Sequence, residues 1–553
     1  MRAHAGRSVR YTMMITAWAV IDILGSVPLR SRRSQAGTVR RMRTPMTIGG
    51  HLDRAALVYG DRIGIVDEPE VAGGSLGPVT YRRMREMARA QAAGLDARGI
   101  GLGERVAVLS QNAGRLLTAF FGVSGFGRVL VPINFRLSPT EIQYILEHSG
   151  ASMLLVDPEL AESVAHLPVA HRIVLGTDTD AALYPEGAEP EPWDDEDEEA
   201  TATINYTSGT TARPKGVEMS HRNLWSNSAI FGWHTGVSDR DTYLHTLPMF
   251  HCNGWGMPYA LTAMGVPQVV LRKVDGAEIL RRIDEHGVTL LCGAPAVVAM
   301  VLEAAASWDG PVPGHGRTRI VVAGAPPPTR TVERIETELG WEMIQIYGLT
   351  ETAPLLTVNR TRSEWDDLSP ADRASKLSRA GVPAVGIDVA IDGQGEILAR
   401  GNHILKSYWD QPEATDDALD GGWFHTGDGG TLDDGGYLTI SDRKKDVIIS
   451  GGENVSSIEV EDALFSHPSV EEVCVIGVPD ERWGETIKAL VVLAPGTTAT
   501  EDELRAWCKE RLAGYKCPTS VDFRDELART ATGKLQKFKL RAPYWEGRER
   551  QVN

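Results

Sequence analysis

Cysteine is scarce in this chain of 553 residues, and the few cysteines are scattered. Cys252, Cys292, Cys474, Cys508 and Cys517 are odd in number and lack the paired spacing of zinc ligands. A disulfide framework and a structural zinc site are therefore not expected. A reducing compartment is the predicted setting, which favours a cytoplasmic protein.

Positive charge is also in short supply. The formal net charge is -17, with 57 Lys and Arg residues against 74 Asp and Glu residues. This balance argues against general nucleic-acid binding, because a phosphate backbone would be repelled except at local basic patches. A nucleotide is not excluded, because a local site can hold it whatever the global charge.

A long uncharged apolar run is missing from the first part of the chain. Residues 1–46 hold nine Arg and a single acidic residue, Asp22, which interrupts the apolar stretch 11–29. A secretory signal needs an uninterrupted apolar core, and a spanning helix needs about 20 apolar residues. We interpret residues 1–46 as a disordered basic extension, or as sequence upstream of a start at Met42 or Met46. Integral membrane association is not expected, and peripheral contact stays open.

Short apolar runs alternate with amphipathic stretches over residues 47–441. The clearest runs predict buried strands and the clearest amphipathic stretches predict helices: strands at 106–109, 129–131 and 153–156, and helices at 81–98 and 139–148. Such alternation predicts an α/β fold with parallel sheets. The acidic segment 189–199 lacks an apolar pattern and is expected to be a solvated loop.

The pattern changes after residue 441. Apolar runs predict strands at 446–450, 470–478 and 486–492. Two capping boxes, one at Ser456 and Glu459 and one at Thr500 and Glu503, predict helix starts, and the second helix is expected to stop at Gly514. Residues 442–553 therefore predict a compact α+β domain.

Polar loops follow three of the predicted strands. Run 203–206 leads into Thr207, Ser208, Gly209, Thr210 and Thr211, run 320–323 into Gly324, Ala325 and Pro326, and run 343–346 into Tyr347, Gly348, Leu349, Thr350 and Glu351. The carboxyl ends of parallel strands face one side of a sheet, and ligands bind in the crevice beyond them. If the three runs belong to one sheet, their loops converge on a single ligand.

The first loop has the chemistry of a polyphosphate site. Residues 206–216 combine hydroxyls, flexible backbone N–H donors and Lys215, the groups that bind phosphate oxygens. The G-x-x-x-x-G-K-[ST] spacing of a P-loop is absent. A Ser/Thr-rich surface loop is the alternative, which eleven residues in this order disfavour.

Four further positions carry possible chemistry, each with an ordinary alternative. The ring of Tyr347 can lie against adenine and Glu351 can hold Mg²⁺ beside phosphates, although alone they suggest core packing and a solvated charge. Asp428 can accept hydrogen bonds from ribose hydroxyls, or simply form a turn. Lys534 follows Gly533 near the C-terminus, where a lone Lys is usually exposed.

These motifs, in this order, resemble the adenylate-forming superfamily of acyl-CoA synthetases, adenylation domains and beetle luciferases. The resemblance covers residues 47–541. It implies a large domain, residues 47–441, with two β-sheets flanked by helices and a small barrel. It also implies a small mobile domain, residues 442–553, that rotates about a hinge at Asp442, although the charged segment 442–446 is also typical of a surface linker.

The resemblance also implies roles for individual residues. Thr207, Ser208, Gly209, Thr210, Thr211 and Lys215 would cradle phosphates; Gly324, Ala325 and Pro326 would line the adenine and acyl pocket; Tyr347 and Gly348 would lie at adenine, Thr350 at the α-phosphate and Glu351 at Mg²⁺; Asp428 and Arg443 would contact ribose; and Lys534 would be the catalytic lysine. Gly452 belongs to a segment expected to enter the site for the thiol step, with Lys445 and Lys516 as weaker candidates beside coenzyme A.

Two positions depart from the family pattern. Ala212 stands where the phosphate loop usually has Gly, and Ala tolerates a positive φ poorly, so the loop is expected to differ in shape there. Ala528 stands where a Pro often precedes the lysine motif, which costs local rigidity.

The acyl group is expected to meet residues 247–255, which read Leu-Pro-Met-Phe-His-Cys-Asn-Gly-Trp. Amino-acid-activating domains usually offer an Asp here, and none is present, so an acid with a neutral tail is favoured. His251 is a candidate gate or a core histidine, and Trp255 a candidate core residue. The predicted activity is ATP- and Mg²⁺-dependent ligation of a short or medium fatty acid to coenzyme A, by a possible homodimer without nucleic-acid partners. Acyl loading of a carrier protein and a catalytically silent nucleotide-binding protein are the alternatives.

Replacing Lys534 should separate the two half-reactions. Lys534→Ala is expected to abolish ATP–pyrophosphate exchange, because its ammonium would stabilise charge on the α-phosphate, yet largely to spare thioester formation from supplied acyl-AMP. Isotope exchange and a thiol-release assay measure the two steps. Unchanged exchange in the variant would remove Lys534 from the mechanism.

Overall fold

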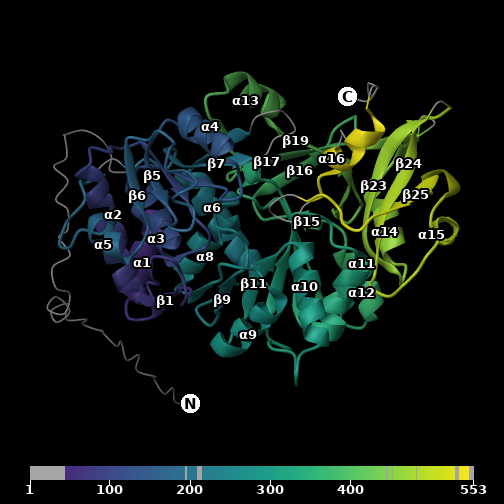
Figure 1. Cartoon of the computed structure of the whole chain (residues 1–553), viewed down its shortest axis with the longest axis horizontal. Helices are drawn as coiled ribbons and strands as arrows, with labels where there is room; N and C mark the ends of the chain where they lie inside the picture. Colours follow the sequence, from purple (N-terminus) through teal and green to yellow (C-terminus); the bar gives the residue numbers. More distant parts are fainter. Residues whose placement is uncertain are drawn as a thin grey trace, which may run out of the picture. The chain divides into compact units, whose positions relative to one another are not determined.

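Four β-sheets with packed helices form the protein, as Figure 1 shows. The computed structural model describes residues 44–193, 196–207, 214–443, 446–450, 453–480, 482–529 and 535–546. Three sheets belong to a large N-terminal domain and the fourth to a small C-terminal domain. The predicted α/β fold class, with a large domain of two main sheets and a smaller half-barrel sheet, is confirmed.

The seven-stranded sheet contains the three strands predicted first from the sequence. In spatial order it comprises β18 (Ser407–Tyr408), β8 (Lys215–Ser220), β7 (Thr201–Thr207), β4 (Val129–Ile133), β3 (Arg105–Leu109), β5 (Ala151–Val156) and β6 (His171–Val174). The strands from β7 to β6 are parallel, whereas β8 and β18 add antiparallel strands at the edge.

The nine-stranded sheet holds the strands that precede the other two polar loops. It comprises β15 (Val382–Pro383), β14 (Thr357–Arg360), β13 (Glu342–Tyr347), β12 (Arg319–Val322), β11 (Leu290–Gly293), β9 (Tyr243–His245), β10 (Gln268–Val270), β1 (Ile63–Val66) and β2 (Pro78–Thr80). Its strands from β13 to β1 are parallel.

The hypothesis that the three polar loops follow strands of one sheet is wrong for the first loop. β12 and β13 are neighbours in the nine-stranded sheet, but β7 pairs with β4 and β8 in the other sheet. The hydrophobic run predicts a buried strand at 203–206, yet every buried parallel strand shows such a run, so the pattern does not identify the pairing partner.

The remaining two sheets are mainly antiparallel. The half-barrel consists of β16 (Ile387–Ile391), β17 (Glu396–Gly401), β19 (Phe424–Leu432) and β20 (Leu438–Arg443). The C-terminal sheet consists of β22 (Glu453–Val455), β21 (Ile448–Ser450), β24 (Gly484–Leu493), β23 (Val470–Asp480) and β25 (Ser520–Phe523). The predicted strands at 470–478 and 486–492 are confirmed, and the one predicted at 446–450 begins at Ile448.

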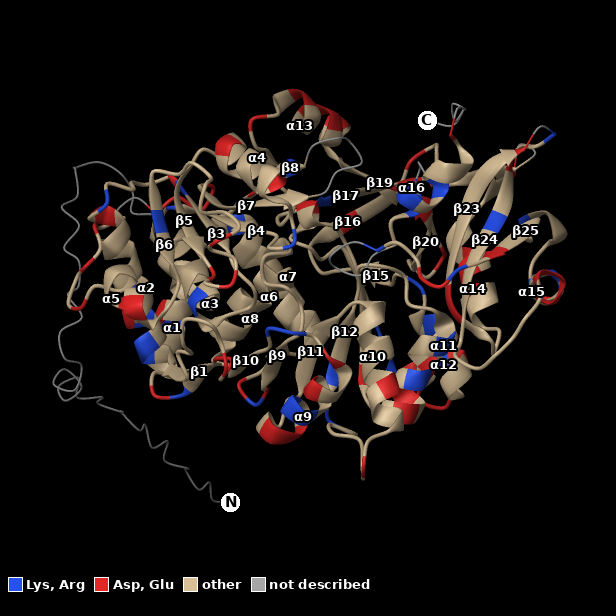
Figure 2. Ribbon diagram, in the orientation of Figure 1, with Lys and Arg blue, Asp and Glu red and all other residues tan. Residues whose placement is uncertain are grey.

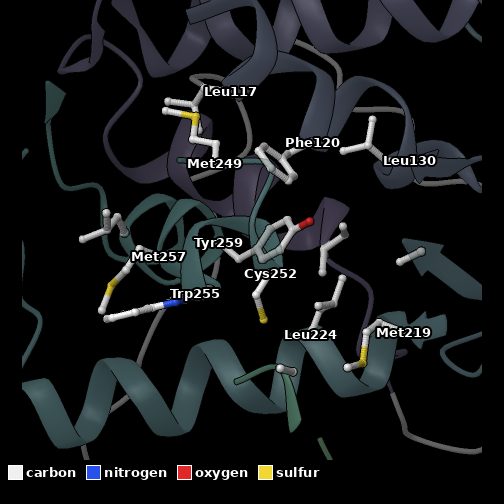
Figure 3. Packing of buried hydrophobic residues seen from close by; sticks show 14 of the residues in the cluster. Leu117, Phe120, Leu130, Met219, Leu224, Met249, Cys252, Trp255, Met257 and Tyr259 are labelled. Carbon is white, nitrogen blue, oxygen red and sulfur yellow. The ribbon is translucent and has the colours of Figure 1, made fainter. Parts of the chain in front are cut away.

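Helices cover the sheets. They are α1 (Gly49–Val58), α2 (Tyr81–Asp96), α3 (Gly114–Gly122), α4 (Pro139–Ser149), α5 (Thr177–Leu183), α6 (His221–Thr235), α7 (Cys252–Trp255), α8 (Met257–Met264), α9 (Gly276–His286), α10 (Pro295–Ala306), α11 (Thr329–Arg334), α12 (Pro370–Leu377), α13 (Pro412–Ala418), α14 (Ser457–Phe465), α15 (Glu501–Lys509) and α16 (Lys537–Arg541). Side chains of α2, α3, α6 and α8 share one core with residues of both large sheets. Figure 3 shows part of that core, where Phe120 meets the ring of Tyr259 edge-on.

Capping residues set the helix ends that the sequence predicts. α2 begins after Thr80, whose side chain accepts a hydrogen bond from the Arg83 N–H. α4 begins with a capping box between Ser138 and Glu141 and ends at Gly150, which adopts the left-handed conformation that glycine tolerates. The helices predicted at 81–98 and 139–148 are confirmed within two residues at each end.

Two details of the C-terminal domain differ from prediction. The capping box at Thr500 and Glu503 is confirmed, but at Ser456 only the serine half forms, because the Glu459 carboxylate binds the Lys516 ammonium at 2.7 Å instead.

The helix expected to stop at Gly514 ends instead at Lys509. The Leu512 N–H bonds back to the Cys508 carbonyl, and the chain then becomes extended at Ala513. This turn brings Leu512 and buried Cys517 onto the core of the domain, so tertiary packing overrides the glycine signal.

Charged segments lie on the outside of the described chain. Figure 2 shows acidic residues in α13. The acidic segment 189–199 has neither helix nor strand in its described part, but it is tied down, because Glu198 accepts hydrogen bonds from the Met46 N–H and from Arg222. Among the described helices, none has both the length and the apolar character that crossing a bilayer requires.

One buried amide joins the two large sheets. Asn112, which follows β3, places its amide nitrogen 3.1, 2.8 and 3.1 Å from the carbonyl oxygens of His245, Leu247 and Leu271. Its amide oxygen accepts from the Met249 N–H at 2.8 Å. The partners belong to the ends of β9 and β10 and to the loop that follows β9, so one side chain from the seven-stranded sheet satisfies the backbone of the other sheet.

Asn112→Ala should therefore destabilise the large domain. Buried backbone groups would lose their partner, at an expected cost of about 2–3 kcal/mol in the free energy of unfolding. Urea denaturation followed by circular dichroism measures it. Gln111→Ala is the matched control, because the side-chain amide of the neighbouring Gln111 donates to the exposed Glu159 carboxylate, and its loss should change stability by less than about 0.5 kcal/mol. Equal stability of both variants would contradict the role of Asn112 as the joint.

Candidate active site

The predicted phosphate loop connects the antiparallel strands of a β-hairpin. β7 ends at Thr207 and β8 begins at Lys215, and these two residues are paired. Ser208, Gly209, Thr210 and Thr211, together with Ala212, lie outside the described residues. The hairpin therefore places Thr207 and Lys215 side by side at the edge of the seven-stranded sheet.

Glu351 lies beside this hairpin although it follows a strand of the other sheet. It belongs to a short 3-10 turn, Thr350–Thr352, directly after β13. Its Oε1 accepts a hydrogen bond from the Tyr408 hydroxyl at 3.0 Å, and its carbonyl oxygen accepts from the Leu405 N–H at 2.7 Å. Lys215 Nζ lies 4.6 Å from the centroid of the same Tyr408 ring. Tyr408 thus connects the predicted metal ligand to the predicted phosphate lysine.

A second group forms around Asp428. The Tyr347 hydroxyl, at the end of β13, donates to Asp428 Oδ2 at 2.8 Å. Arg443 faces Asp428 across the paired strands β19 and β20, with its Nε 3.5 Å from Asp428 Oδ1. Asp428 is buried within a strand rather than placed in a turn. The structure therefore brings together the residues predicted to contact adenine and ribose.

The two groups are electrostatically coupled. Burial raises the pKa of Glu351. The hydrogen bond from Tyr408 and the positive charge of Arg443 lower this pKa in part, whereas the negative charge of Asp428 raises it further. Burial likewise raises the pKa of Tyr347, and the Asp428 carboxylate adds to the rise. Glu351, Asp428 and Arg443 are thus close enough to act on one another across the ends of β13, β19 and β20.

The loop after β12 lies next to this position. Gly324 adopts a positive φ of 93°, a conformation open to glycine, and it is exposed together with Ala325 and Pro326. Because β12 and β13 are parallel neighbours, this loop and the Tyr347 loop leave the same edge of the sheet.

Gly348 has a steric role. A Cβ atom at this position would lie 1.5 Å from the Pro354 carbonyl oxygen, so no side chain fits. Thr350 is half-buried beside it, and its carbonyl oxygen lies 4.0 Å from Cys252 Sγ. This contact links the Glu351 turn to the predicted acyl-binding segment.

The predicted acyl-binding segment adopts an unusual left-handed turn. Cys252, Asn253, Gly254, Trp255 and Gly256 have φ values of 47°, 52°, 59°, 61° and 76°. The left-handed conformation costs about 1–2 kcal/mol for each residue that is not glycine. The sequence patterns used above do not predict this turn.

Buried hydrogen bonds hold the turn in place. Asn253 Nδ2 donates to Thr203 Oγ1 at 3.0 Å, and Asn205 Nδ2 donates to Asn253 Oδ1 at 3.1 Å. Both partners belong to β7, which leads into the phosphate loop. Cys252 and Trp255 are buried in the core that Figure 3 shows, so Trp255 packs as a core residue, whereas His251 is half-buried before the turn.

The hinge candidate is tied to the C-terminal domain. Asp442 is buried, and its Oδ2 accepts a hydrogen bond from the Ser457 N–H at the start of α14 at 2.7 Å. Lys516, a weaker coenzyme candidate, is paired with Glu459. Lys534, Gly452 and Lys445 lie outside the described residues.

The donor set around Glu351 fits Mg²⁺ bound with a nucleotide. The described residues contain no group of three or more His, Cys, Asp or Glu that could hold a metal by themselves. Mg²⁺ characteristically takes one or two protein carboxylates plus phosphate oxygens. A single carboxylate beside a phosphate loop matches that preference.

Comparison with known proteins gives the family. The model of the AMP-binding enzyme family matches residues 51–409, and that of the AMP-binding enzyme C-terminal domain matches residues 459–534. The chain therefore belongs to the AMP-binding enzyme family, within the adenylate-forming superfamily that its motifs resemble.

Similar proteins span most of the chain. The 2-methylpropanoate–CoA ligase CCL4 of Humulus lupulus is 37% identical over 90% of this chain and 95% of its own length. The 4-hydroxybutyrate–CoA ligase 2 of Metallosphaera sedula is 35% identical over 89% and 93%. A structure of O-succinylbenzoate coenzyme A synthetase from Bacillus subtilis, in complex with ATP and magnesium ion, has a TM-score of 0.76 at 30% identity and covers 89% of this chain and 98% of that one.

Several residues at the site escape the sequence motifs. Tyr408 belongs to none of the motifs described above. The pairing of β18 with β8 brings it to Glu351. Asn112, Asn205 and Asn253 act through buried amides. The one available signal is the position of these Asn residues directly after, or within, apolar runs, where an amide needs a partner.

Asp428→Asn should weaken nucleotide binding. The substitution removes the negative charge that pairs with the Arg443 guanidinium and that would accept hydrogen bonds from ribose, so we expect about a tenfold rise in the dissociation constant for ATP. Isothermal titration calorimetry measures the constant. Tyr347→Phe is the matched control, since it removes the hydroxyl bonded to Asp428 but leaves the carboxylate. Similar losses in both variants would argue that Asp428 acts only by holding Tyr347.

Proposed function

We propose that the protein is an ATP-dependent acid–CoA ligase. A carboxylate substrate attacks the α-phosphorus of ATP, giving acyl-AMP and pyrophosphate, and the thiol of coenzyme A then attacks the acyl carbonyl, giving the thioester and AMP. The observation that carries the proposal is the convergence of the Glu351–Tyr408–Lys215 group and the Tyr347–Asp428–Arg443 group at one edge of the large domain. The relatives named as CoA ligases support the same chemistry.

Each group has a proposed task. Thr207 and Lys215, with Ser208, Gly209, Thr210 and Thr211, hold the β- and γ-phosphates. Tyr347, Gly348, Gly324, Ala325 and Pro326 form the adenine side, and Asp428 and Arg443 bind ribose. Mg²⁺ held by Glu351 would neutralise phosphate charge, and Thr350 and Lys534 would act at the α-phosphate.

The first step requires positioning more than proton transfer. The attacking carboxylate is already ionised at neutral pH, so the protein must bring it against a negatively charged polyphosphate. Lys215 lies over the Tyr408 ring and Arg443 lies beside Asp428, and both cations would face the proposed nucleotide. Fixed cations of this kind reduce the repulsion between the two anions.

We infer that the second step uses a rotation of residues 442–553 against residues 47–441. The Ser456 hydroxyl donates to the Ser441 carbonyl across that boundary, and Asp442, the hinge candidate, accepts a hydrogen bond from the Ser457 N–H within the C-terminal part. Rotation there would carry Lys534 away from the site and bring in Gly452. His251, at the start of the acyl-binding turn, is the proposed gate.

The substrate is proposed to be a fatty acid of short to medium length. The predicted acyl segment 247–255 contains no Asp or Glu that could pair with an amine. Met249, Phe250 and Trp255 are large and buried, so the segment is already filled and favours a small apolar tail. Two relatives are named for acids with four carbon atoms, 2-methylpropanoate and 4-hydroxybutyrate, which supports the same size class.

A panel of acids tests this preference. With acetate, butyrate, hexanoate, decanoate, palmitate and benzoate, we expect kcat/KM to be at least about tenfold higher for butyrate or hexanoate than for palmitate and benzoate. Release of AMP that depends on free coenzyme A is the measurement. A preference for benzoate or palmitate would contradict the assignment, and AMP release without any response to coenzyme A would favour loading of a carrier protein.

A further inference from the structure

Tyr408 touches both of the ionic groups that face the proposed triphosphate. Its hydroxyl donates to Glu351 Oε1 at 3.0 Å, while its ring faces Lys215, whose Nζ is 4.6 Å from the ring centroid. Tyrosine suits this position, because its hydroxyl can donate to a carboxylate while its π face attracts an ammonium. One side chain therefore contacts an acid through its tip and a base through its face.

The backbone around Tyr408 fixes the ring. β18 pairs with β8, so that Tyr408 lies opposite Val217, two residues beyond Lys215. The Tyr408 N–H donates to Thr415 Oγ1 at 2.9 Å, and the preceding Ser407 and Lys406 both bind the buried Glu218 carboxylate. Tyr408 as a whole residue is 8% exposed. Tyr408 is thus held from both sides before any nucleotide binds.

The separation of Lys215 and Glu351 needs an explanation. They carry opposite charges and share one neighbour, yet within the described residues no ion pair joins them. A direct pair would occupy both groups, and a nucleotide would have to break it. With the ring between them, the ammonium and the carboxylate each keep unused bonding capacity for phosphate oxygens and for a metal ion.

We propose that Tyr408 is a positioning residue that holds Glu351 and Lys215 apart and ready for the metal–triphosphate group. This inference rests on the proposed function. The two contacts of Tyr408 make separate contributions. Its hydroxyl orients the Glu351 carboxylate toward the metal, and its ring prevents Lys215 from pairing with Glu351.

Tyr408→Phe tests the first contribution, because it removes the hydroxyl and keeps the ring. A hydrogen bond to a charged group is lost, so the dissociation constant of MgATP should rise about tenfold. Binding of ATP in excess EDTA and of AMP should change by less than about twofold. Calorimetry in each condition measures binding without turnover, and the thermal midpoint shows whether the variant is folded.

Tyr408→Leu tests the second contribution, because it removes the ring as well. Lys215 can then pair with Glu351, so binding of metal-free ATP should weaken too, whereas AMP binding should again stay within about twofold. Tyr437→Phe is the matched control for both variants. Tyr437 is also buried in the large domain, but it packs against Trp365 in the other core cluster. Loss of its hydroxyl should leave the dissociation constants of MgATP, metal-free ATP and AMP unchanged.

A double-mutant cycle with Glu351→Gln completes the test. If Tyr408 acts through Glu351, the effect of Tyr408→Phe on MgATP binding should largely disappear in the Glu351→Gln background. Additive effects, or equal losses for MgATP, metal-free ATP and AMP, would overturn the proposal and leave a purely structural role. The proposed function fails separately, if the wild-type protein binds MgATP with this pattern but forms no acyl-CoA from any acid in the panel.

Discussion

The site depends on how two separate sheets are joined. The β7–β8 hairpin belongs to the seven-stranded sheet, whereas the Glu351 turn follows a strand of the nine-stranded sheet, and among the described strands no backbone ladder links the two sheets. Buried amides replace that ladder: Asn112 satisfies backbone groups at the ends of β9 and β10, and Asn205 binds Asn253 in the predicted acyl-binding turn. An unpaired buried amide is costly, so each of these bonds also specifies one relative placement of the sheets.

The left-handed turn at residues 252–256 shows what that joint supports. Three of its residues are not glycine, so the conformation is unfavourable by itself. Asn253 is among the residues that tolerate it best, and its side chain is also the one that bonds to Thr203 and Asn205. Strained backbone persists where the surroundings over-determine it. The predicted acyl-binding segment and the strand that leads into the predicted phosphate loop are therefore parts of one buried network.

Much of the architecture is predictable from local pattern. Buried runs predict β3, β4 and β5, amphipathic stretches predict α2 and α4, and a capping box predicts where α15 begins, because these signals depend on neighbouring residues alone. The motif residues Tyr347, Glu351, Asp428 and Arg443 do meet. What the pattern does not predict depends on long-range pairing: the assignment of β7 to its own sheet, the end of α15 at Lys509, and the arrival of Tyr408 beside Glu351.

Asp442 has a consequence for the timing of the proposed reaction cycle. Its buried carboxylate accepts a hydrogen bond from the first turn of α14, where a helix attracts negative charge. A small displacement would stretch this bond without replacing it, so the bond resists the first few degrees of any movement of α14 away from Asp442. The proposed rotation should therefore begin with the breaking of this bond rather than as gradual drift.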